Sequence, residues 1–489
     1  MRAIVERVLG LVPGAAAYAD VRVVHRRHEG LHVQDDALGQ ALTEESLGMG
    51  VRVLLDGQWG FAATAYLDGP GLENAVARAV EQARAARGLG PAVRLAPARA
   101  IVDTYATPLV RDPFQVPLAE KVGLLLAAVR ALRPDGQRNN GLRLTREASS
   151  DIFQDHKLFA STEGALIEQT ITETGAGLLA TASDGADVQR RSYPQSVPRS
   201  IRGQRGDFAT AGWEHVQRMR LVDEAPRVGA EAVALLSADP CPDTTTTLIV
   251  GGTQMALLVH ETAGHPAELD RVLGSEASLA GGSFMEPHLR GSLRFGSDLV
   301  TITADATLSG GMGSFAYDDE GVPGQRTVIV DRGTFVGYLT GREAAGAVGE
   351  AASSGAARAD GWSRVPLVRM TNLSIEPGET PFEEMVGTTE DGILVDMNRS
   401  LSIDDNRLSF RFGCEMGWEI RAGKRGRMLK NCTYTGVTPR FWAGCDAVGD
   451  AASWRLYGLP SCNKGEPLQV AHIGHGTVPA RFRSVRVGV

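Results

Sequence analysis

The sequence predicts an α+β fold, with a helix-on-sheet domain over residues 1–222 and a β-rich domain over residues 223–489 that is built around one apolar helix. Apolar and polar residues alternate along several segments of the first part, as in strands with one buried face. Two longer segments place apolar residues at helical spacing. The chain of 489 residues also contains 58 glycines, which favour a fold rich in turns and sheets over a helical bundle.

The elements of the first part follow from these patterns. The predicted strands are 19–24, 50–55 and the two halves of 141–179, and the predicted helices are 72–86 and 118–132. Helices that pack on one face of such strands form an α+β domain.

A helical stretch near 227–236 and the polar turn after it mark the passage to the second part, and we place the domain boundary near residue 222. Beyond it, strands are predicted at 299–306, 327–330 and 393–396. Residues 349–361 are small and polar and lack anchors, so this segment is predicted to be a mobile loop.

The charge balance argues against two classes of partner. The formal net charge is −8, whereas nucleic acids and anionic membranes attract clustered positive charge. The one basic cluster, over 421–430, has the glycine spacing of a solvated hairpin turn. No segment approaches the roughly 18 apolar residues that a membrane span needs. Together with the charged residues near the N-terminus, this predicts a cytoplasmic location. Five scattered cysteines without a CxxC pair predict reduced thiols.

Residues 260–265 read His-Glu-Thr-Ala-Gly-His, a pattern that is typical of a metal site built for hydrolysis. Zinc binds neutral imidazole nitrogens at roughly 2.0–2.1 Å, and a catalytic site keeps one position open for a water molecule whose pKa falls to about 7. Glu261, between the two imidazoles, is then placed to take a proton from that water.

The spacing of the two histidines is unusual. Residues i and i+5 of a regular helix point roughly 140° apart, so a straight helix cannot aim both imidazoles at one ion. Gly264 and Pro266 flank the second histidine and are typical of a helix end. We therefore expect an apolar helix through 255–259 to deliver His260 and Glu261, with His265 on an unwound segment.

A catalytic zinc usually takes a third protein ligand, which spacing alone does not identify. One candidate is Cys462, because the small and turn-forming residues around it would leave a thiolate accessible, and there are five others. These others are Glu268, Asp270, Glu276, His472 and His475.

Several separated segments resemble the TldD/PmbA family of metallopeptidases. They are the His-Glu-x-x-x-His hexapeptide, the glycine-rich patterns at 48–53 and 60–62, the segments 317–324 and 369–372, and the Cys-x-Lys-Gly element at Cys462. The resemblance covers nearly the whole chain. Within this family the TldD branch keeps the intact hexapeptide and the PmbA (TldE) branch lacks it, so the chain resembles the TldD branch.

The resemblance implies that His260, His265 and Cys462 hold zinc and that Glu261 is the general base. In this chain Asn463 follows the cysteine where relatives often have glycine, and His475 adds an imidazole nearby. His475 therefore stays open as the third ligand or as a residue that orients substrate or water. Asp319 is a further candidate for orienting a substrate.

The predicted activity is zinc-dependent hydrolysis of unstructured peptides, in which Glu261 takes a proton from water and passes it to the leaving amine. The resemblance implies a dimer, either with a motif-lacking PmbA/TldE-type paralogue or with a second copy. An alternative is a zinc amidohydrolase that acts on a small-molecule amide. A purely structural metal site is less favoured, because it needs no base and is normally closed by four ligands.

Overall fold

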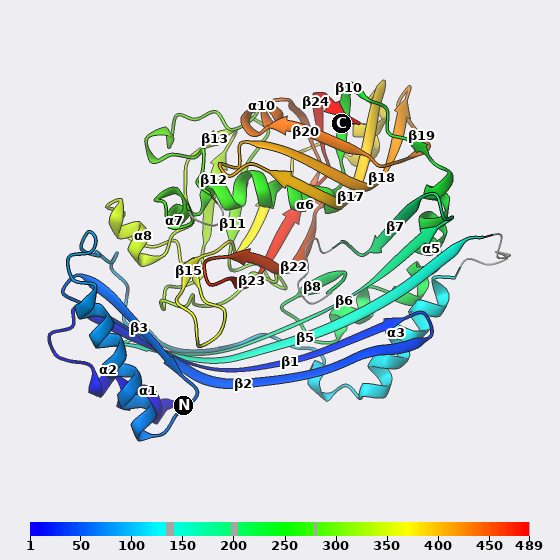
Figure 1. The fold of residues 1–489 in the computed structure, drawn as a ribbon. Helices are drawn as coiled ribbons and strands as arrows, with labels where there is room; N and C mark the ends of the chain where they lie inside the picture. Colours follow the sequence, from blue (N-terminus) through cyan, green and yellow to red (C-terminus); the bar gives the residue numbers. More distant parts are fainter. Residues whose placement is uncertain (134–140, 197–203, 278–280, 489) are drawn as a thin grey trace.

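The computed structural model describes residues 1–133, 141–196, 204–277 and 281–488, and it confirms the α+β prediction. In Figure 1 a long, curved sheet from the first part of the chain lies beneath a β-rich body formed by the second part. Helix α6 (Gly252–Val259) runs through the middle of that body, as expected for the apolar helix.

The lower layer is an eight-stranded sheet in the order β3-β2-β1-β5-β6-β4, with β7 and β8 also paired to β6. The strands are β1 (Tyr18–Gln34), β2 (Ala37–Leu55), β3 (Gln58–Thr64), β4 (Val102–Ala106), β5 (Arg143–Ser161), β6 (Leu166–Ser183), β7 (Val188–Tyr193) and β8 (Asp207–Ala209). The first two strands are much longer than predicted, because polar residues that follow the apolar stretch of β1, such as His25 and Arg26, hide the alternation.

Helices pack on both ends of this sheet. Helices α1 (Arg2–Leu11) and α2 (Gly69–Ala85) share an apolar core with β1–β3, and α3 (Leu118–Ala131) and α5 (Leu221–Ser237) share another with β5 and β6. The short α4 (Glu214–Arg218) precedes α5. Residue 222 lies in the first turn of α5, whose apolar side contacts the first sheet.

The upper body contains a closed ring of five strands, since β17 pairs with both β10 and β18. The ring is β10 (Thr244–Val250), β17 (Asp391–Ile403), β18 (Ser409–Arg421), β20 (Thr433–Val437) and β24 (Ala480–Val487), and β9 (Asp239–Pro240), β19 (Lys424–Lys430) and β21 (Cys445–Val448) extend it.

A six-stranded sheet in the order β13-β12-β11-β16-β23-β22 completes the body. It comprises β11 (Ile302–Asp305), β12 (Arg326–Asp331), β13 (Thr334–Phe335), β16 (Asn372–Ile375), β22 (Arg455–Lys464) and β23 (Gln469–Thr477). The remaining strands and α-helices are β14 (Ala357–Arg358), β15 (Leu367–Val368), α7 (Leu269–Val272), α8 (Arg342–Ala347), α9 (Phe382–Gly387) and α10 (Thr438–Ala443).

Helix α6 is short and apolar because it lies between two sheets. It contacts β17 of the ring on one side and β16, β22 and β23 of the six-stranded sheet on the other. Met255, Leu258 and Val259 are fully buried in the largest apolar core of the chain. A helix with apolar residues on every side has no solvent face, and here it carries the next residues into the interior.

Two loop predictions have different outcomes. The basic cluster forms the β18–β19 hairpin as predicted, and several of its charges pair with acidic residues, for example Arg421 with Asp391. Residues 349–361, predicted to lack anchors, are held in place instead. Ser353 and Ser354 bond to Thr340, and Arg26 of β1 pairs with Asp360. These partners are distant in sequence, so local composition could not show them.

All five cysteines are free. Among the residues that the structure describes, none of the helices combines the length and the apolar character needed to cross a bilayer.

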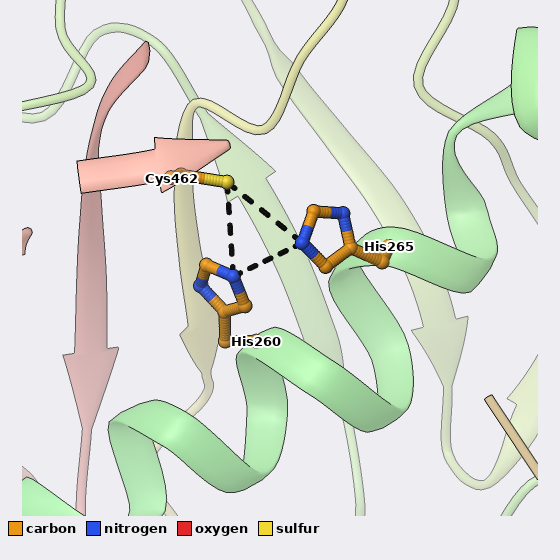
Figure 2. A group of neighbouring side chains, drawn as sticks. All are labelled: His260, His265 and Cys462. Atoms are coloured by element: carbon orange, nitrogen blue, oxygen red, sulfur yellow. Dashed lines mark hydrogen bonds between the residues drawn. The ribbon is translucent and has the colours of Figure 1, made fainter. Parts of the chain in front are cut away.

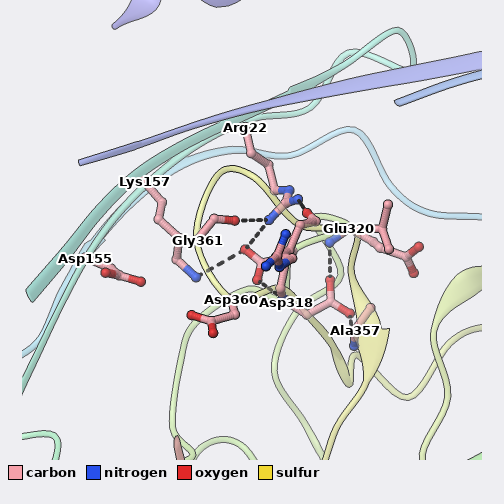
Figure 3. A network of polar contacts seen from close by, with 12 residues as sticks. Arg22, Asp155, Lys157, Asp318, Glu320, Ala357, Asp360 and Gly361 are labelled. Carbon is pink, nitrogen blue, oxygen red and sulfur yellow. Dashed lines mark hydrogen bonds and ion pairs between the residues drawn. The ribbon is translucent and has the colours of Figure 1, made fainter. Parts of the chain in front are cut away.

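Buried ion pairs join the first sheet to the upper body. Arg52 of β2 binds Asp20 at 2.5 Å and Glu320 at 3.1 Å, and all three side chains are almost fully buried. Nearby, Lys157 lies 3.1 Å from Asp319, and Arg22 donates to the carbonyl oxygen of Gly361 (Figure 3). Buried charges are tolerated only when they are paired, so this network fixes how the two layers meet.

Replacing Asp20 with alanine is expected to destabilise the protein by about 3 kcal/mol or more, because the buried charge of Arg52 would lose one of its two carboxylate partners. The measurement is the midpoint of urea unfolding. Glu6→Ala, which removes an exposed partner of Arg2, is the control and should leave the midpoint unchanged. Equal midpoints for the two variants would contradict a structural role for the network.

Candidate metal centre

Three of the predicted side chains converge on one point (Figure 2). Nε2 of His260 lies 3.2 Å from Nε2 of His265, and Sγ of Cys462 lies 3.7 Å from the first nitrogen and 3.8 Å from the second. All three residues are buried. We call them the His-His-Cys group, and their side chains offer one ligand atom each toward a common centre.

A π-helical turn brings the two imidazoles together. Helix α6 ends at Val259, the turn spans His260–Gly264, and a 3-10 turn follows over His265–Ala267. The backbone N–H of His265 donates to the carbonyl oxygen of His260, which stacks residue i+5 above residue i. The prediction of an unwound segment at His265 is therefore wrong, because one wider turn aligns the side chains while the helix continues.

Gly264 allows close packing and does not unwind the helix. Its backbone is right-handed helical, at φ −66° and ψ −66°. A Cβ atom at this position would lie 2.1 Å from Sδ of Met370 and 2.8 Å from Cδ2 of Leu373. Pro266 lies in the first turn of the 3-10 segment, where its missing N–H is tolerated. A side chain here would have to displace Met370 and Leu373, so glycine lets the π-turn approach β16 this closely.

Cys462 enters the group from β22. The pairing of β22 with β23 shifts between Leu459 and Cys462, and such an irregularity re-aims a side chain. Arg369 donates to the carbonyl oxygen of Cys462 at 2.5 Å. Burial alone would raise the pKa of the Cys462 thiol, but the positive charges of Arg369 and the two imidazoles hold it well below its usual value. The thiolate is the form that binds metals.

Each imidazole has a partner at its other ring nitrogen. Nδ1 of His265 lies 3.0 Å from Oε2 of Glu268, and Nδ1 of His260 lies 3.0 Å from Nε2 of His475. Burial and the neighbouring His260 and His265 hold the pKa of His475 well below its usual value. In its neutral form, His475 can accept a hydrogen bond at Nε2 from the Nδ1–H group of His260. When the Nδ1 atom of each imidazole donates its proton to such a partner, the Nε2 atom carries the lone pair that faces the centre.

Lys464 supports Glu268 from behind. Nζ of Lys464 lies 3.4 Å from Oε2 of Glu268, and both side chains are fully buried. Burial would raise the pKa of Glu268, but the charges of Lys464, His265 and Arg271 hold it well below its usual value. The lysine of the Cys-x-Lys-Gly element thus keeps a carboxylate ionised beside His265.

The other candidate ligands have partners elsewhere. Asp270 binds Nζ of Lys464 at 2.6 Å, and Glu276 accepts from the backbone N–H of Gly465 at 3.2 Å. His472 pairs with Glu173 of β6. The structure therefore places these three residues around the group and not within it.

Glu261 lies against an arginine that the sequence did not suggest. Nη1 of Arg407 lies 2.5 Å from Oε2 of Glu261, and both side chains are largely buried. Arg407 belongs to the turn between β17 and β18, 146 positions further along the chain. The sequence around it, with Asp404 and Asp405, is typical of an ordinary surface turn. No local pattern therefore identifies Arg407 as a partner of Glu261.

Asp319 lies apart from the His-His-Cys group. Its carboxylate binds Lys157 and accepts from the backbone N–H of Ala359 at 2.8 Å. Burial would raise the pKa of Asp319, but Lys157 and Arg22 hold it below its usual value. Asp319 lines a cavity of about 860 Å³ between the first sheet and the upper body, and Ser461, the neighbour of Cys462, lines it too.

The donor set fits zinc. In a tetrahedral zinc site two nitrogen ligands lie about 3.3 Å apart, and a nitrogen and a sulfur ligand about 3.6 Å apart. The measured separations of 3.2, 3.7 and 3.8 Å agree with this geometry. Two imidazoles and a thiolate also leave a fourth position, the arrangement that distinguishes a catalytic zinc site from a closed structural one.

The chain matches three family models in succession. Residues 19–83 match PmbA/TldA metallopeptidase domain 1, residues 111–238 match the central domain, and residues 243–487 match the C-terminal domain.

Known proteins agree with these matches. A metalloprotease of Synechocystis sp. is 30% identical over 98% of this chain and 96% of its own length, and a metalloprotease of Methanothermobacter thermautotrophicus is 29% identical over 96% and 95%. The crystal structure of TldE from Thermococcus kodakarensis has the same fold, with a TM-score of 0.70 at 15% identity over 100% of this chain and 99% of that one. The chain belongs to the PmbA/TldD family of metallopeptidases.

Proposed function

We propose that this protein is a zinc-dependent peptidase of the TldD branch, in which His260, His265 and Cys462 hold the metal and Glu261 is the general base. One observation carries the proposal. Three buried donor atoms form a triangle with the dimensions of a zinc site, and a carboxylate from the same helical turn lies beside it. The intact hexapeptide, which the PmbA branch lacks, supports the assignment to the TldD branch.

Zinc is favoured by the chemistry of the donors. A thiolate with two imidazoles suits a borderline-soft ion, whereas magnesium and calcium prefer oxygen ligands. When bound, zinc would polarise the scissile carbonyl and acidify a water molecule.

The residues of the chain then have distinct tasks. Glu261 takes a proton from the attacking water and returns it to the leaving amine nitrogen as the C–N bond breaks. Glu268 and His475 hold the two imidazoles in the tautomer whose Nε2 faces the centre. The charge of Arg369 lowers the pKa of the Cys462 thiol and so favours its thiolate. These tasks require exact placement, which the buried surroundings supply.

An extended peptide is the proposed substrate. A β-rich body can bind a peptide by main-chain hydrogen bonds to a strand, which tolerates many sequences but requires an unfolded segment. Asp319 and Lys157, on the wall of the 860 Å³ cavity, are candidates for orienting it. A small-molecule amide as substrate is less favoured, because the relatives that match nearly the whole chain are named metalloproteases.

We further propose that the protein acts as a dimer in the cytoplasm. The likeness to TldE supports a motif-lacking TldE-type paralogue as the second subunit, and a second copy of this chain is the alternative. Free cysteines fit a reducing compartment.

Glu261→Gln is expected to lower kcat by about 10²–10⁴-fold while the zinc content stays at the wild-type level, because the amide cannot take a proton. His265→Ala and Cys462→Ala are expected to lose zinc and activity together. Zinc content is measured by elemental analysis beside a peptide-cleavage assay. Full zinc in the Cys462→Ala variant would overturn the assignment of the thiolate as a ligand, and full activity in the Glu261→Gln variant would overturn the assignment of the base.

Unfolded substrates are expected to be cleaved much faster than folded ones. The test compares one small protein in two forms, reduced and unfolded or native with its disulfides intact, with cleavage followed by mass spectrometry. A set of small amides is assayed in parallel. Rapid turnover of an amide with no cleavage of the unfolded chain would support the amidohydrolase alternative.

Glu268→Gln is expected to weaken zinc binding by about 10–100-fold, because a neutral amide replaces the carboxylate that pairs with Nδ1 of His265. The affinity is measured by competition with a chelator. Glu286→Gln, at an exposed position, is the matched control and should bind zinc like the wild type. Unchanged affinity in the Glu268→Gln variant would show that this carboxylate does not support the site.

A further inference from the structure

The side chain of Arg407 is aimed at the catalytic region by a rigid turn. The residue lies between β17 and β18 with a left-handed backbone, at φ 62°. Asp404 closes the turn, since its backbone oxygen accepts from the N–H of Arg407 and its carboxylate from the N–H groups of Leu408 and Ser409. Thr438 donates to the carbonyl oxygen of Arg407 at 3.0 Å. A backbone held at this many points fixes the direction of the guanidinium before a substrate arrives.

The guanidinium has donors to spare. Nη1 bonds to Glu261, but Nε is buried and has no hydrogen-bond partner among the described residues. Leaving a buried donor unpaired costs about 1–3 kcal/mol, and more when the group is charged. A ligand that brings an acceptor oxygen beside Glu261 would give the guanidinium a second partner.

We propose that Arg407 is a further catalytic residue, which donates hydrogen bonds to the oxygen of the scissile carbonyl as that oxygen becomes negative. The inference rests on the proposed peptidase function. The water oxygen forms a bond to the carbonyl carbon, the C=O π pair moves to the carbonyl oxygen, and the water proton passes to Glu261. A permanent positive charge with several fixed donors stabilises such an oxyanion, and a preorganised site makes the effect large.

The placement also explains why the residue is an arginine. Nη1 of the planar guanidinium holds Glu261 in position, and the other nitrogens of the group lie at a fixed angle to that bond. A lysine ammonium on a flexible stem keeps the charge but lacks this fork. The base and the oxyanion donor are thereby held as one unit by a single side chain.

The test uses the full-length, zinc-loaded protein with Arg407→Ala, Arg407→Lys and, as the control, Arg411→Ala. Arg411 is an exposed arginine four residues further along the same chain segment. Arg407→Ala is expected to lower kcat by about 10²-fold with KM nearly unchanged. Arg407→Lys should recover part of the loss, and Arg411→Ala should match the wild type. Zinc content should be equal in the wild type and all the variants.

A binding measurement separates this role from a structural one. By calorimetry, a phosphinic peptide with a tetrahedral anion at the scissile position should bind Arg407→Ala about 10²-fold more weakly than the wild type. The same peptide with an uncleavable N-methylated planar amide should bind both equally. Equal weakening for both peptides would instead mark Arg407 as a ground-state anchor and overturn the proposal, as would unchanged kcat. If the alanine variant does not fold, the same comparison with Arg407→Lys decides.

Failure of this role for Arg407 is distinguishable from failure of the proposed function. A wild type that neither binds zinc nor cleaves any peptide would refute the peptidase assignment itself. An active wild type, an inactive Glu261→Gln and an unaffected Arg407→Ala would refute the inference about Arg407 alone.

Discussion

One backbone hydrogen bond, from the N–H of His265 to the carbonyl oxygen of His260, sets the geometry on which the centre depends. A regular α-helix would place these imidazoles roughly 140° apart, and no rearrangement of the surrounding sheets would correct that. The wider turn aligns them and still leaves Glu261 on the same turn. The π-turn packs closely against the side chains of Met370 and Leu373, because Gly264 has no side chain to separate them.

The two sheets of the upper body contribute to the centre from opposite sides. The closed ring supplies Arg407 through the β17–β18 turn, and the six-stranded sheet supplies Cys462 and His475. Helix α6 lies between them and carries the histidines. Around the His-His-Cys group, Arg369 lowers the pKa of the Cys462 thiol and the Nδ1 atom of each imidazole has a partner. Both features suit the proposed role of the three residues as metal ligands.

The sequence predicted most of what depends on local pattern. The helices at 72–86 and 118–132 correspond to α2 and α3, and the strands around 141–179 to β5 and β6. The hexapeptide could be recognised from its residue types and spacing, whereas Cys462 was one of several candidates for the third ligand and was singled out only by the resemblance to the family. The π-turn could not be predicted, since Gly264 and Pro266 also suit the end of a helix and the packing against β16 is not visible in the sequence. The contact of Arg407 with Glu261 and that of Lys464 with Glu268 join positions that are distant in the chain. A single sequence does not record such contacts.

The separation of the ligands along the chain has a consequence for synthesis. Cys462 lies 202 positions after His260, and its strand pairs with β23, which follows it. While the polypeptide emerges from the ribosome, the histidine pair and Glu261 are made long before the thiolate and its supporting lysine exist. A nascent chain therefore carries His260, Glu261 and His265 without the sulfur that completes the triangle. Under the proposed assignment of ligands, the capacity to cut peptides begins only after β22 has been made and has paired with β23.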